Sequence, residues 1–297
     1  MDQLMLPGQQ DCTFQHYNTQ TPTKESGIFQ SLSLKGRTAI VTGAGAGIGY
    51  AVVEAFAEAG ANIALWYNSN KLAIEKAALI SQNYGVTCKA YRVNITDENS
   101  VKAAVDEAVS DLNGRLDIFV ANSGIPWLNG PIIDSDTKAF QNLFDINFTS
   151  VYFAAKIAGS HFRRQKLEGT SLDGKKLENY NQGSFIITAS ISGIRQLMPQ
   201  AGTPYGVSKA ALIHLTKCLA IEWIQFARVN CVSPAYITTE MVEHAPGVMR
   251  DPWRGRTPMG REGSVNEVKG AYAYLASDAA SYTTGSNLVV DGGYTCV

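Results

Sequence analysis

Two residues whose types and spacing suit proton transfer lie in the segment 203–212. Tyr205 and Lys209 are four residues apart, so on a helix they share one face about one turn apart. A phenol has an ordinary pKa of about 10, and a nearby ammonium group lowers that pKa by favouring the phenolate. The pair is therefore a candidate general acid and base. The same spacing is also common for surface pairs on amphipathic helices, so its meaning depends on the rest of the chain.

A glycine-rich turn near the start of the chain could bind a phosphate group. Residues 37–42 read as a short buried strand, glycines follow in 43–49, and an amphipathic stretch follows them. The spacing is Thr42-Gly43-x-x-x-Gly47-Ile48-Gly49. Glycines let the backbone approach a pyrophosphate, and the amides of a helix start supply hydrogen-bond donors. A turn that binds nothing is the alternative, which the flanking strand and helix disfavour.

The motifs together resemble those of the short-chain dehydrogenase/reductase family. Its other marks follow in order from Leu34 to the C-terminus: Asn122-Ser123-Gly124, Asn147, Ser190, Tyr205, Lys209 and Ser233-Pro234-Ala235-Tyr236-Ile237. Two marks differ from the usual pattern, since Asn-Ala-Gly has become Asn-Ser-Gly and Pro-Gly has become Pro-Ala. Further segments look like fungal NADPH-dependent L-sorbose reductases and related carbonyl reductases: 66–69, 220–223, 226–230, 258–263 and 291–296.

This resemblance implies hydride transfer coupled to proton transfer on a carbonyl or alcohol. Tyr205 would exchange the proton, and Lys209 would hold the nicotinamide ribose and lower the tyrosine pKa. Ser190 would hydrogen-bond the carbonyl oxygen, and Asn147 would anchor a water in a proton relay. Each has a structural alternative, because Ser190 could end a strand and Asn147 could cap a kinked helix. Ser192 is a rival for Ser190, which we prefer because it aligns with the serine ending the fifth strand.

The end of the second strand indicates the cofactor. An acidic residue there would bind the ribose hydroxyls and repel a 2′-phosphate, but segment 66–71 has none, so NADP is favoured. Asn68, Ser69 and Asn70 could donate to the phosphate; Ser69 or Asn70 could equally cap a helix. The full set of predicted cofactor contacts is Gly43, Gly47, Ile48, Gly49, Asn68, Ser69, Asn70, Asn94, Asn122, Lys156, Tyr205, Lys209, Ile237 and Thr239. For Lys156, a solvated or subunit-facing position is an equal alternative.

Composition narrows the class of protein. The 297 residues carry 25 basic and 26 acidic side chains, a net charge of −1, which implies neither a nucleic-acid surface nor a basic membrane patch. The five cysteines are scattered without metal-ligand spacing, so we expect no metal site and reduced thiols. The N-terminus shows no signal-peptide pattern and no apolar run is long enough to span a membrane, so we expect a cytoplasmic protein.

Strand and helix patterns alternate along the chain, as a parallel sheet with helical crossovers requires. We therefore predict an α/β fold: one domain with a Rossmann-type, doubly wound parallel sheet of about seven strands. The predicted strands are 37–42, 62–67, 87–93, 116–121, 184–189, 228–232 and 287–290. Predicted helices begin near Gly47, Lys71, Asp97, Thr137, Pro204 and Ser264.

Three segments stand outside this regular pattern. Residues 1–33 are predicted to be an N-terminal arm before a catalytic domain of residues 34–297, 165–182 a surface insertion, and 240–258 a substrate lid containing His244 and Trp253. Further substrate contacts are expected from 125–127, 191–198 and Tyr236. The resemblance implies a homotetramer that acts on a small carbonyl or alcohol. A tailoring ketoreductase with a bulkier substrate and a non-catalytic NADP-binding protein are the alternative functions.

Overall fold

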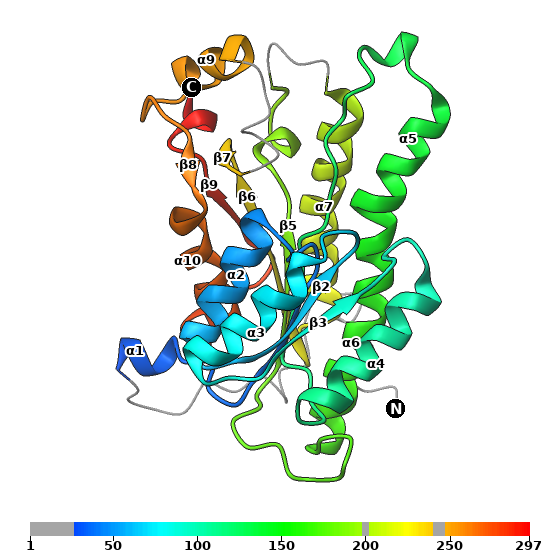
Figure 1. The fold of residues 1–297 in the computed structure, drawn as a ribbon, viewed down its shortest axis with the longest axis vertical. Helices are drawn as coiled ribbons and strands as arrows, with labels where there is room; N and C mark the ends of the chain where they lie inside the picture. Colours follow the sequence, from blue (N-terminus) through cyan, green and yellow to red (C-terminus); the bar gives the residue numbers. More distant parts are fainter. Residues whose placement is uncertain (1–26, 198–201, 240–246) are drawn as a thin grey trace, which may run out of the picture.

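The core is a seven-stranded parallel sheet with the strand order β3-β2-β1-β4-β5-β6-β9 (Figure 1). The structure, a computed structural model, describes residues 27–197, 202–239 and 247–297. Crossovers on either side of β1 place the first and fourth strands next to each other at the centre, which is the doubly wound arrangement. The strands are β1 (Thr38–Val41), β2 (Asn62–Tyr67), β3 (Cys88–Arg92), β4 (Ile118–Ala121), β5 (Gly183–Thr188), β6 (Ala227–Pro234) and β9 (Asn287–Val290).

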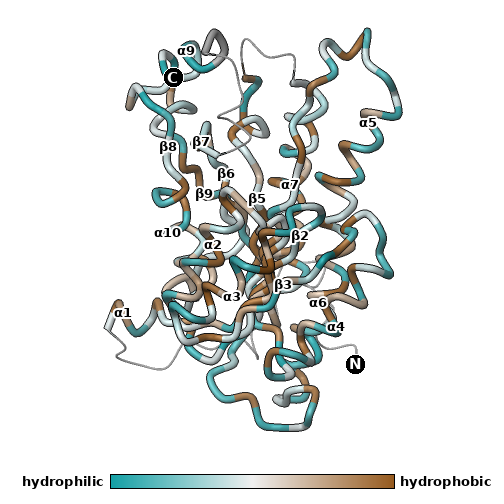
Figure 2. Tube along the Cα trace, in the orientation of Figure 1, coloured by the Kyte–Doolittle hydropathy of each residue, from teal (hydrophilic) through white to brown (hydrophobic). Residues whose placement is uncertain are grey.

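Helices cover both faces of the sheet. One face carries α2 (Gly47–Glu58), α3 (Leu72–Tyr84) and α10 (Val265–Ala276), and the other carries α4 (Glu98–Leu112), α6 (Ser150–Glu168) and α7 (Thr203–Glu222) (Figure 1). The apolar residues concentrate along the central strands (Figure 2), because strands covered on both faces have no polar side. Two hydrophobic clusters result, one on each side of the sheet.

A row of aromatic rings organises the core on the α4–α6–α7 side. Trp66 meets Phe119 edge to face with 5.7 Å between ring centroids, and Phe119 stacks on Phe185 at 5.4 Å. Phe185 in turn contacts Trp223 at 5.7 Å. These rings come from β2, β4, β5 and the end of α7, so they link three strands of the sheet to a helix that covers it.

The predicted fold class is confirmed, and the element boundaries differ by a few residues at most. The largest difference concerns residues 165–168, predicted as part of the insertion, which form the last turn of α6. Gln165 is fully buried there: Leu116 N donates to its Oε1 at 2.7 Å, and its Nε2 donates to Leu116 O at 2.6 Å. The loop that follows begins at Gly169, where the left-handed backbone ends the helix.

Several short elements had no sequence signal. They are α1 (Ile28–Ser31), η2 (Ile132–Asp134), the π-helical turn η3 (Asp145–Thr149), η4 (Ile191–Gly193), β7 (Ile237–Thr238), α9 (Gly247–Arg256), β8 (Gly263–Ser264), η5 (Asp278–Ala280) and η6 (Tyr294–Cys296). The helix α5 (Thr137–Phe144) starts where a helix was predicted. Residues 1–26 of the predicted arm lie outside the described residues. So do residues 240–246 of the predicted lid, with His244, and Met198 of the predicted substrate contacts.

Candidate active site

A cleft of ≈ 600 Å³ opens at the carboxyl edge of the sheet, where the loops after the parallel strands meet. It lies at the switch point between β1 and β4, the usual position for a ligand in a doubly wound sheet. The structure brings together at this cleft most of the predicted site residues: Gly43, Gly47, Ile48, Gly49, Asn68, Asn94, Asn122, Ser190, Tyr205, Lys209, Ile237 and Thr239.

The glycine turn is packed too closely for side chains. A Cβ on Gly49 would lie 2.5 Å from Gly43 O and 2.6 Å from Asn122 Nδ2, closer than any carbon can approach. Gly43 and Gly47 both have left-handed backbones, with φ of 62° and 56°. Glycine is therefore required at these positions. The turn leads into the first turn of α2, and the amides of a helix start are donors suited to an anion.

Tyr205 is positioned by the packing of the η4 turn against α7. A Cβ on Gly193 would lie 2.6 Å from the main-chain carbon of Lys209, and one on Gly206 would lie 2.9 Å from Ser192 O. The two glycines thus allow η4 to touch the helix. Because Ser190 directly precedes η4, this contact brings Ser190 to Tyr205, and the two side chains share a hydrogen bond.

Ser190 and Ser192 occupy different environments. Ser190 lines the cleft and is 7% exposed, whereas Ser192 does not line it. Ser190 Oγ accepts a hydrogen bond from Ser192 N at 3.1 Å and donates one to Ser192 Oγ at 3.2 Å. Ser192 therefore supports the orientation of Ser190, which agrees with the preference for Ser190.

Lys209 is buried at the base of the cleft. Its Nζ donates to Thr188 O at 2.8 Å and lies 5.7 Å from the centroid of the Tyr205 ring. Burial lowers the Lys209 pKa to about 8, because a desolvated ammonium group loses hydration. It remains mostly charged at neutral pH.

The expected lowering of the Tyr205 pKa is not found in the protein alone. Burial raises the Tyr205 pKa, and the hydrogen bond with Ser190 only partly opposes this shift. The physical reason is that burial lowers the Lys209 pKa to about 8, so the lysine has already lost its charge at the pH where the phenol would ionise. Tyr205 is therefore a protonated phenol at neutral pH, the form that donates a proton.

Asn147 lies in the π-helical turn η3 and is fully buried. Its side chain is bound to the backbone of Ile125, accepting from Ile125 N at 2.8 Å and donating to Ile125 O at 3.1 Å. Gly124 faces both polar groups, because a Cβ there would lie 3.3 Å from Asn147 Oδ1 and 3.5 Å from Lys209 Nζ. The π turn thus carries a buried amide that lies beside the buried lysine.

The far end of the cleft, after β2 and β3, carries polar groups without a carboxylate. Asn68 and Asn94 line the cleft. Asn70 instead caps α3, accepting from Leu72 N at 3.1 Å, and its Nδ2 donates to Gly45 O at 3.2 Å. Ser69 is exposed on the same turn. The structural alternative therefore applies to Asn70, whereas Asn68 lines the cleft.

Arg92 is a cation at this end that sequence reasoning missed. Its Nε donates to Asn68 O at 3.0 Å. Arg92 ends β3 and pairs in register with Tyr67, the last residue of β2. A basic residue at the end of the strand next to β2 would have been the signal for it.

Some predicted residues lie away from the cleft. Lys156 is 60% exposed on α6 and forms an ion pair with Glu98 at 2.7 Å, so the surface alternative applies to it. Trp127 is 9% exposed and donates to Gly130 O within its own loop. Tyr236 stacks on Trp253 of α9 with 4.2 Å between centroids. Tyr236 and Trp253 thus anchor α9, whose residues belong to the predicted lid.

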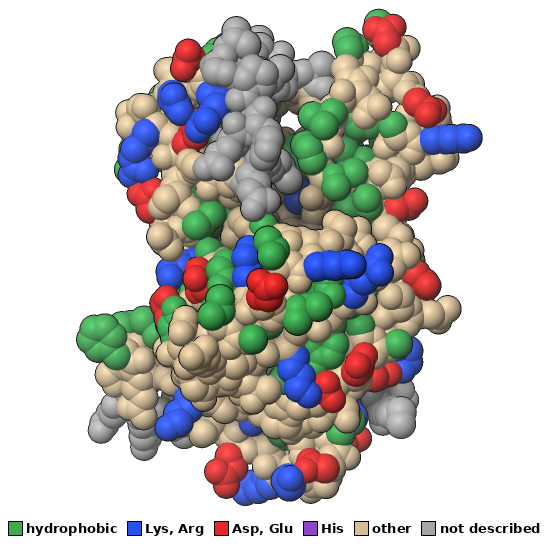
Figure 3. All heavy atoms as spheres, in the orientation of Figure 1, with side chains coloured by type: hydrophobic (Ala, Val, Ile, Leu, Met, Phe, Trp, Pro, Cys, Tyr) green, Lys and Arg blue, Asp and Glu red, His purple; other side chains and the backbone are tan. Residues whose placement is uncertain are grey.

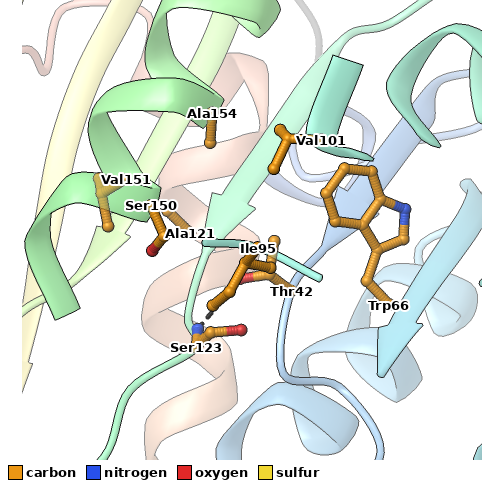
Figure 4. Close-up of a pocket in the computed structure, with 9 residues that line it drawn as sticks. All are labelled: Thr42, Trp66, Ile95, Val101, Ala121, Ser123, Ser150, Val151 and Ala154. Atoms are coloured by element: carbon orange, nitrogen blue, oxygen red, sulfur yellow. Dashed lines mark hydrogen bonds between the residues drawn. The ribbon is translucent and has the colours of Figure 1, made fainter. Parts of the chain in front are cut away.

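Two polar residues at the ends of the central strands were not among the predicted contacts. Thr188 and Ser123 both line the cleft. Behind Ser123 lies a small cavity of ≈ 10 Å³, where Ser123 N donates to Thr42 Oγ1 at 3.0 Å (Figure 4). The hydrogen bond joins the loop after β4 to the end of β1, so the two central strands present their loops as one unit.

The residues present fit a dinucleotide. The glycine turn leaves backbone room that any side chain would fill, and the cleft extends from that turn to Asn68 in one direction and to Tyr205 in the other. Among the described residues, no group of three or more histidine, cysteine, aspartate or glutamate side chains could hold a metal ion. In the same part of the chain no helix is both long and apolar enough to cross a membrane.

Comparisons with known proteins agree with this geometry. Residues 43–295 match the family model described as enoyl-(acyl carrier protein) reductase. The chain is 55% identical over 282 residues to an L-xylulose reductase of Hypocrea jecorina, covering 95% of this chain and 98% of that one. It is 45% identical to a sorbose reductase of Candida albicans, with 94% of each chain covered. An NADPH-dependent 3-quinuclidinone reductase from Rhodotorula rubra has the same fold, with a TM-score of 0.86, 36% identity and coverage of 95% and 99%.

The chain belongs to the short-chain dehydrogenase/reductase family. It is therefore an oxidoreductase that interconverts a carbonyl and an alcohol, as the sequence motifs predicted.

Proposed function

We propose that this enzyme reduces the carbonyl of a ketose with NADPH, and that Asn147, Ser190, Tyr205 and Lys209 form its catalytic set. The observation that carries the proposal is the meeting of Ser190, Tyr205 and Lys209 with the glycine turn in one cleft. The relatives named for L-xylulose and sorbose reduction support a small polyhydroxy ketone as substrate.

Each catalytic side chain has a distinct part in the reaction. A bound nicotinamide supplies the hydride. Tyr205 donates its phenolic proton to the carbonyl oxygen as the alkoxide develops. Ser190 donates a hydrogen bond to the same oxygen, which orients and polarises the carbonyl. Lys209 supplies a buried positive charge. Asn147 fixes the backbone of Ile125 beside it, and by the family resemblance it would anchor a water that relays protons to Lys209.

NADPH is preferred to NADH because of the charges after β2 and β3. Segment 66–71 has no carboxylate that would repel a 2′-phosphate, and Arg92 holds a guanidinium beside Asn68. Asn68 and Ser69 can donate to the phosphate. The NADPH-dependent neighbour of known structure supports the same preference.

The test is NADPH oxidation by the purified chain with a panel of ketones. L-xylulose, L-sorbose and D-fructose should be reduced, and aryl or polycyclic ketones should be poor substrates. Turnover of only large polycyclic ketones would favour a tailoring ketoreductase. Tight NADPH binding without turnover of any ketone would favour a non-catalytic binding protein.

We further propose that the enzyme is a cytoplasmic homotetramer. The outer face of α5, α6 and α7 exposes Phe140 (37%), Tyr152 (53%) and Val207 (52%), a set of apolar side chains suited to a second copy. Hydrophobic side chains also gather over α5 and α7 at the upper right of Figure 3. A twofold axis would pair these helices, and the last strand and helix would form another contact.

A further inference from the structure

A buried chain of side-chain hydrogen bonds runs from α10 to the glycine turn. Tyr272 of α10 is fully buried, and its hydroxyl lies 2.8 Å from Thr188 Oγ1 at the end of β5. Thr188 Oγ1 donates to Asn122 Oδ1 at 3.1 Å. Asn122 Nδ2 donates to Thr42 O at 3.0 Å and to Gly43 O at 3.3 Å. Four elements are thereby joined at the base of the cleft.

The groups at the two ends of this row of hydrogen bonds determine which side chains donate and which accept. Asn122 Nδ2 faces two carbonyl oxygens, so the amide oxygen must face Thr188. An amide oxygen only accepts, and the threonine hydroxyl has a single hydrogen, which is used on Asn122. Tyr272 must therefore donate to Thr188. Tyr272 stays protonated, because burial strongly raises its pKa.

This row of hydrogen bonds ends at the glycine turn, the part of the cleft proposed to receive the cofactor. Asn122 Nδ2 satisfies the carbonyl of Gly43, the left-handed residue that starts the glycine turn. If the amide of Asn122 rotated, its oxygen would face Gly43 O, and two acceptors would repel each other. Thr188 stabilises the observed orientation of the amide, because its hydroxyl donates to the amide oxygen.

Thr188 also connects the turn to the catalytic lysine. Its main-chain oxygen accepts from Lys209 Nζ at 2.8 Å, while its side chain holds Asn122. One residue at the end of β5 therefore contacts both the glycine-turn network and Lys209. Tyr272 fixes that residue from outside the cleft.

We propose that Tyr272 and Thr188 are positioning residues for cofactor binding, which hold Asn122 and through it the glycine turn in the geometry that accepts NADPH. This inference rests on the proposed NADPH-dependent function. The loss of either hydroxyl should loosen the turn without changing a group that touches the cofactor phosphates.

The experiment compares single-atom and isosteric variants. Tyr272→Phe removes the first donor, and Thr188→Val removes the second hydroxyl with little change in volume. Thr188→Ser keeps that hydroxyl and serves as the rescue variant. Tyr274→Phe is the matched control, because Tyr274 is on the same helix and its hydroxyl lies 2.8 Å from Thr283 Oγ1, away from the cleft.

NADPH affinity is measured for each variant by fluorescence titration, and thermal unfolding is followed without cofactor. Loss of one hydrogen bond corresponds to roughly a 3- to 10-fold change in affinity. We expect the NADPH Kd to rise by that factor in Tyr272→Phe and at least as much in Thr188→Val. The Kd should remain near the wild-type value in Thr188→Ser and in Tyr274→Phe.

The outcomes separate this inference from the proposed function. If the wild-type chain does not bind NADPH, the proposed function itself is contradicted. If the wild-type chain binds NADPH and Tyr272→Phe and Thr188→Val bind it equally well, only the positioning role is overturned. A rise in Kd that is the same in Tyr274→Phe, or that follows the loss of thermal stability across all variants, would also overturn it.

Discussion

Lys209 Nζ is bonded to the main-chain oxygen of Thr188 at 2.8 Å, not to the Tyr205 hydroxyl four residues away in the sequence. The lysine is thus held in place before a cofactor arrives, and its charge is set by burial. The pKa values of the two residues are shifted in opposite directions, downward for Lys209 and upward for Tyr205.

This relationship predicts the pH dependence of reduction. Lys209, with a pKa of about 8, is charged below that pH and neutral above it, whereas Tyr205 stays protonated over the same range. The kcat/KM for NADPH, which reports groups of the free enzyme, should be level from pH 6 to about 7.5 and fall about tenfold per pH unit above about 8. In Lys209→Arg, whose guanidinium keeps its charge, this fall near pH 8 should disappear. If kcat/KM still falls near pH 8 in that variant, the ionisation of another group causes the fall.

Ser69→Asp should change the cofactor preference. A carboxylate at the end of β2 would repel a 2′-phosphate but could accept from a ribose hydroxyl, so NADPH should bind much more weakly and NADH nearly as before. The ratio of kcat/KM values for the two cofactors measures this effect. If the ratio stays the same, the phosphate lies elsewhere in the cleft.

The contact of η4 with α7 can be tested with two glycines in helices. Gly206→Ala puts a Cβ 2.9 Å from Ser192 O, so η4 must shift and the kcat should fall. Gly270→Ala on α10 has no atom within 4 Å of its Cβ and should raise the free energy of unfolding by up to about 1 kcal/mol. Activity and thermal unfolding of both variants are the measurements. Wild-type kcat in Gly206→Ala would show that the contact does not position Ser190 and Tyr205.

Val207→Glu should dissociate the proposed tetramer. This α7 side chain is 52% exposed in the monomer, and a charge there would be buried between paired helices. Leu79→Glu is the control, because Leu79 is 51% exposed on α3, on the opposite face of the sheet. Light scattering at micromolar concentration should give a tetramer for the wild type and the control, and a smaller mass for Val207→Glu. A wild-type mass near the 32.0 kDa monomer would contradict the tetramer itself.

Local patterns predicted the fold and most of the cleft. The glycine spacing of 43–49 and the helical spacing of Tyr205 and Lys209 depend on neighbours in the sequence, and alternation of strands with helices places their loops on one edge. Residues that meet across the fold were not predictable in this way. Tyr272 and Thr188 are 84 residues apart, and their contact depends on α10 packing over β5.

The burial of a side chain and the direction in which it points were also not predictable from the sequence. The sequence indicated one helix for Asn147 and Lys156, but it did not show that α6 packs against α4, where Lys156 pairs with Glu98 at 2.7 Å. The upward shift of the Tyr205 pKa likewise follows from desolvation of the phenol at the cleft, which no local motif reveals.

The most direct test of the central claim is Tyr205→Phe. The substitution removes only the proton donor, so the variant should fold normally and bind NADPH with nearly the wild-type Kd. General acid catalysis typically contributes about 100- to 10,000-fold, and the kcat for ketose reduction should fall by that factor. The measurement is kcat for L-xylulose reduction, together with the NADPH Kd of the same preparation. A kcat near that of the wild type, with NADPH bound normally, would contradict the assignment of Tyr205 as the catalytic acid.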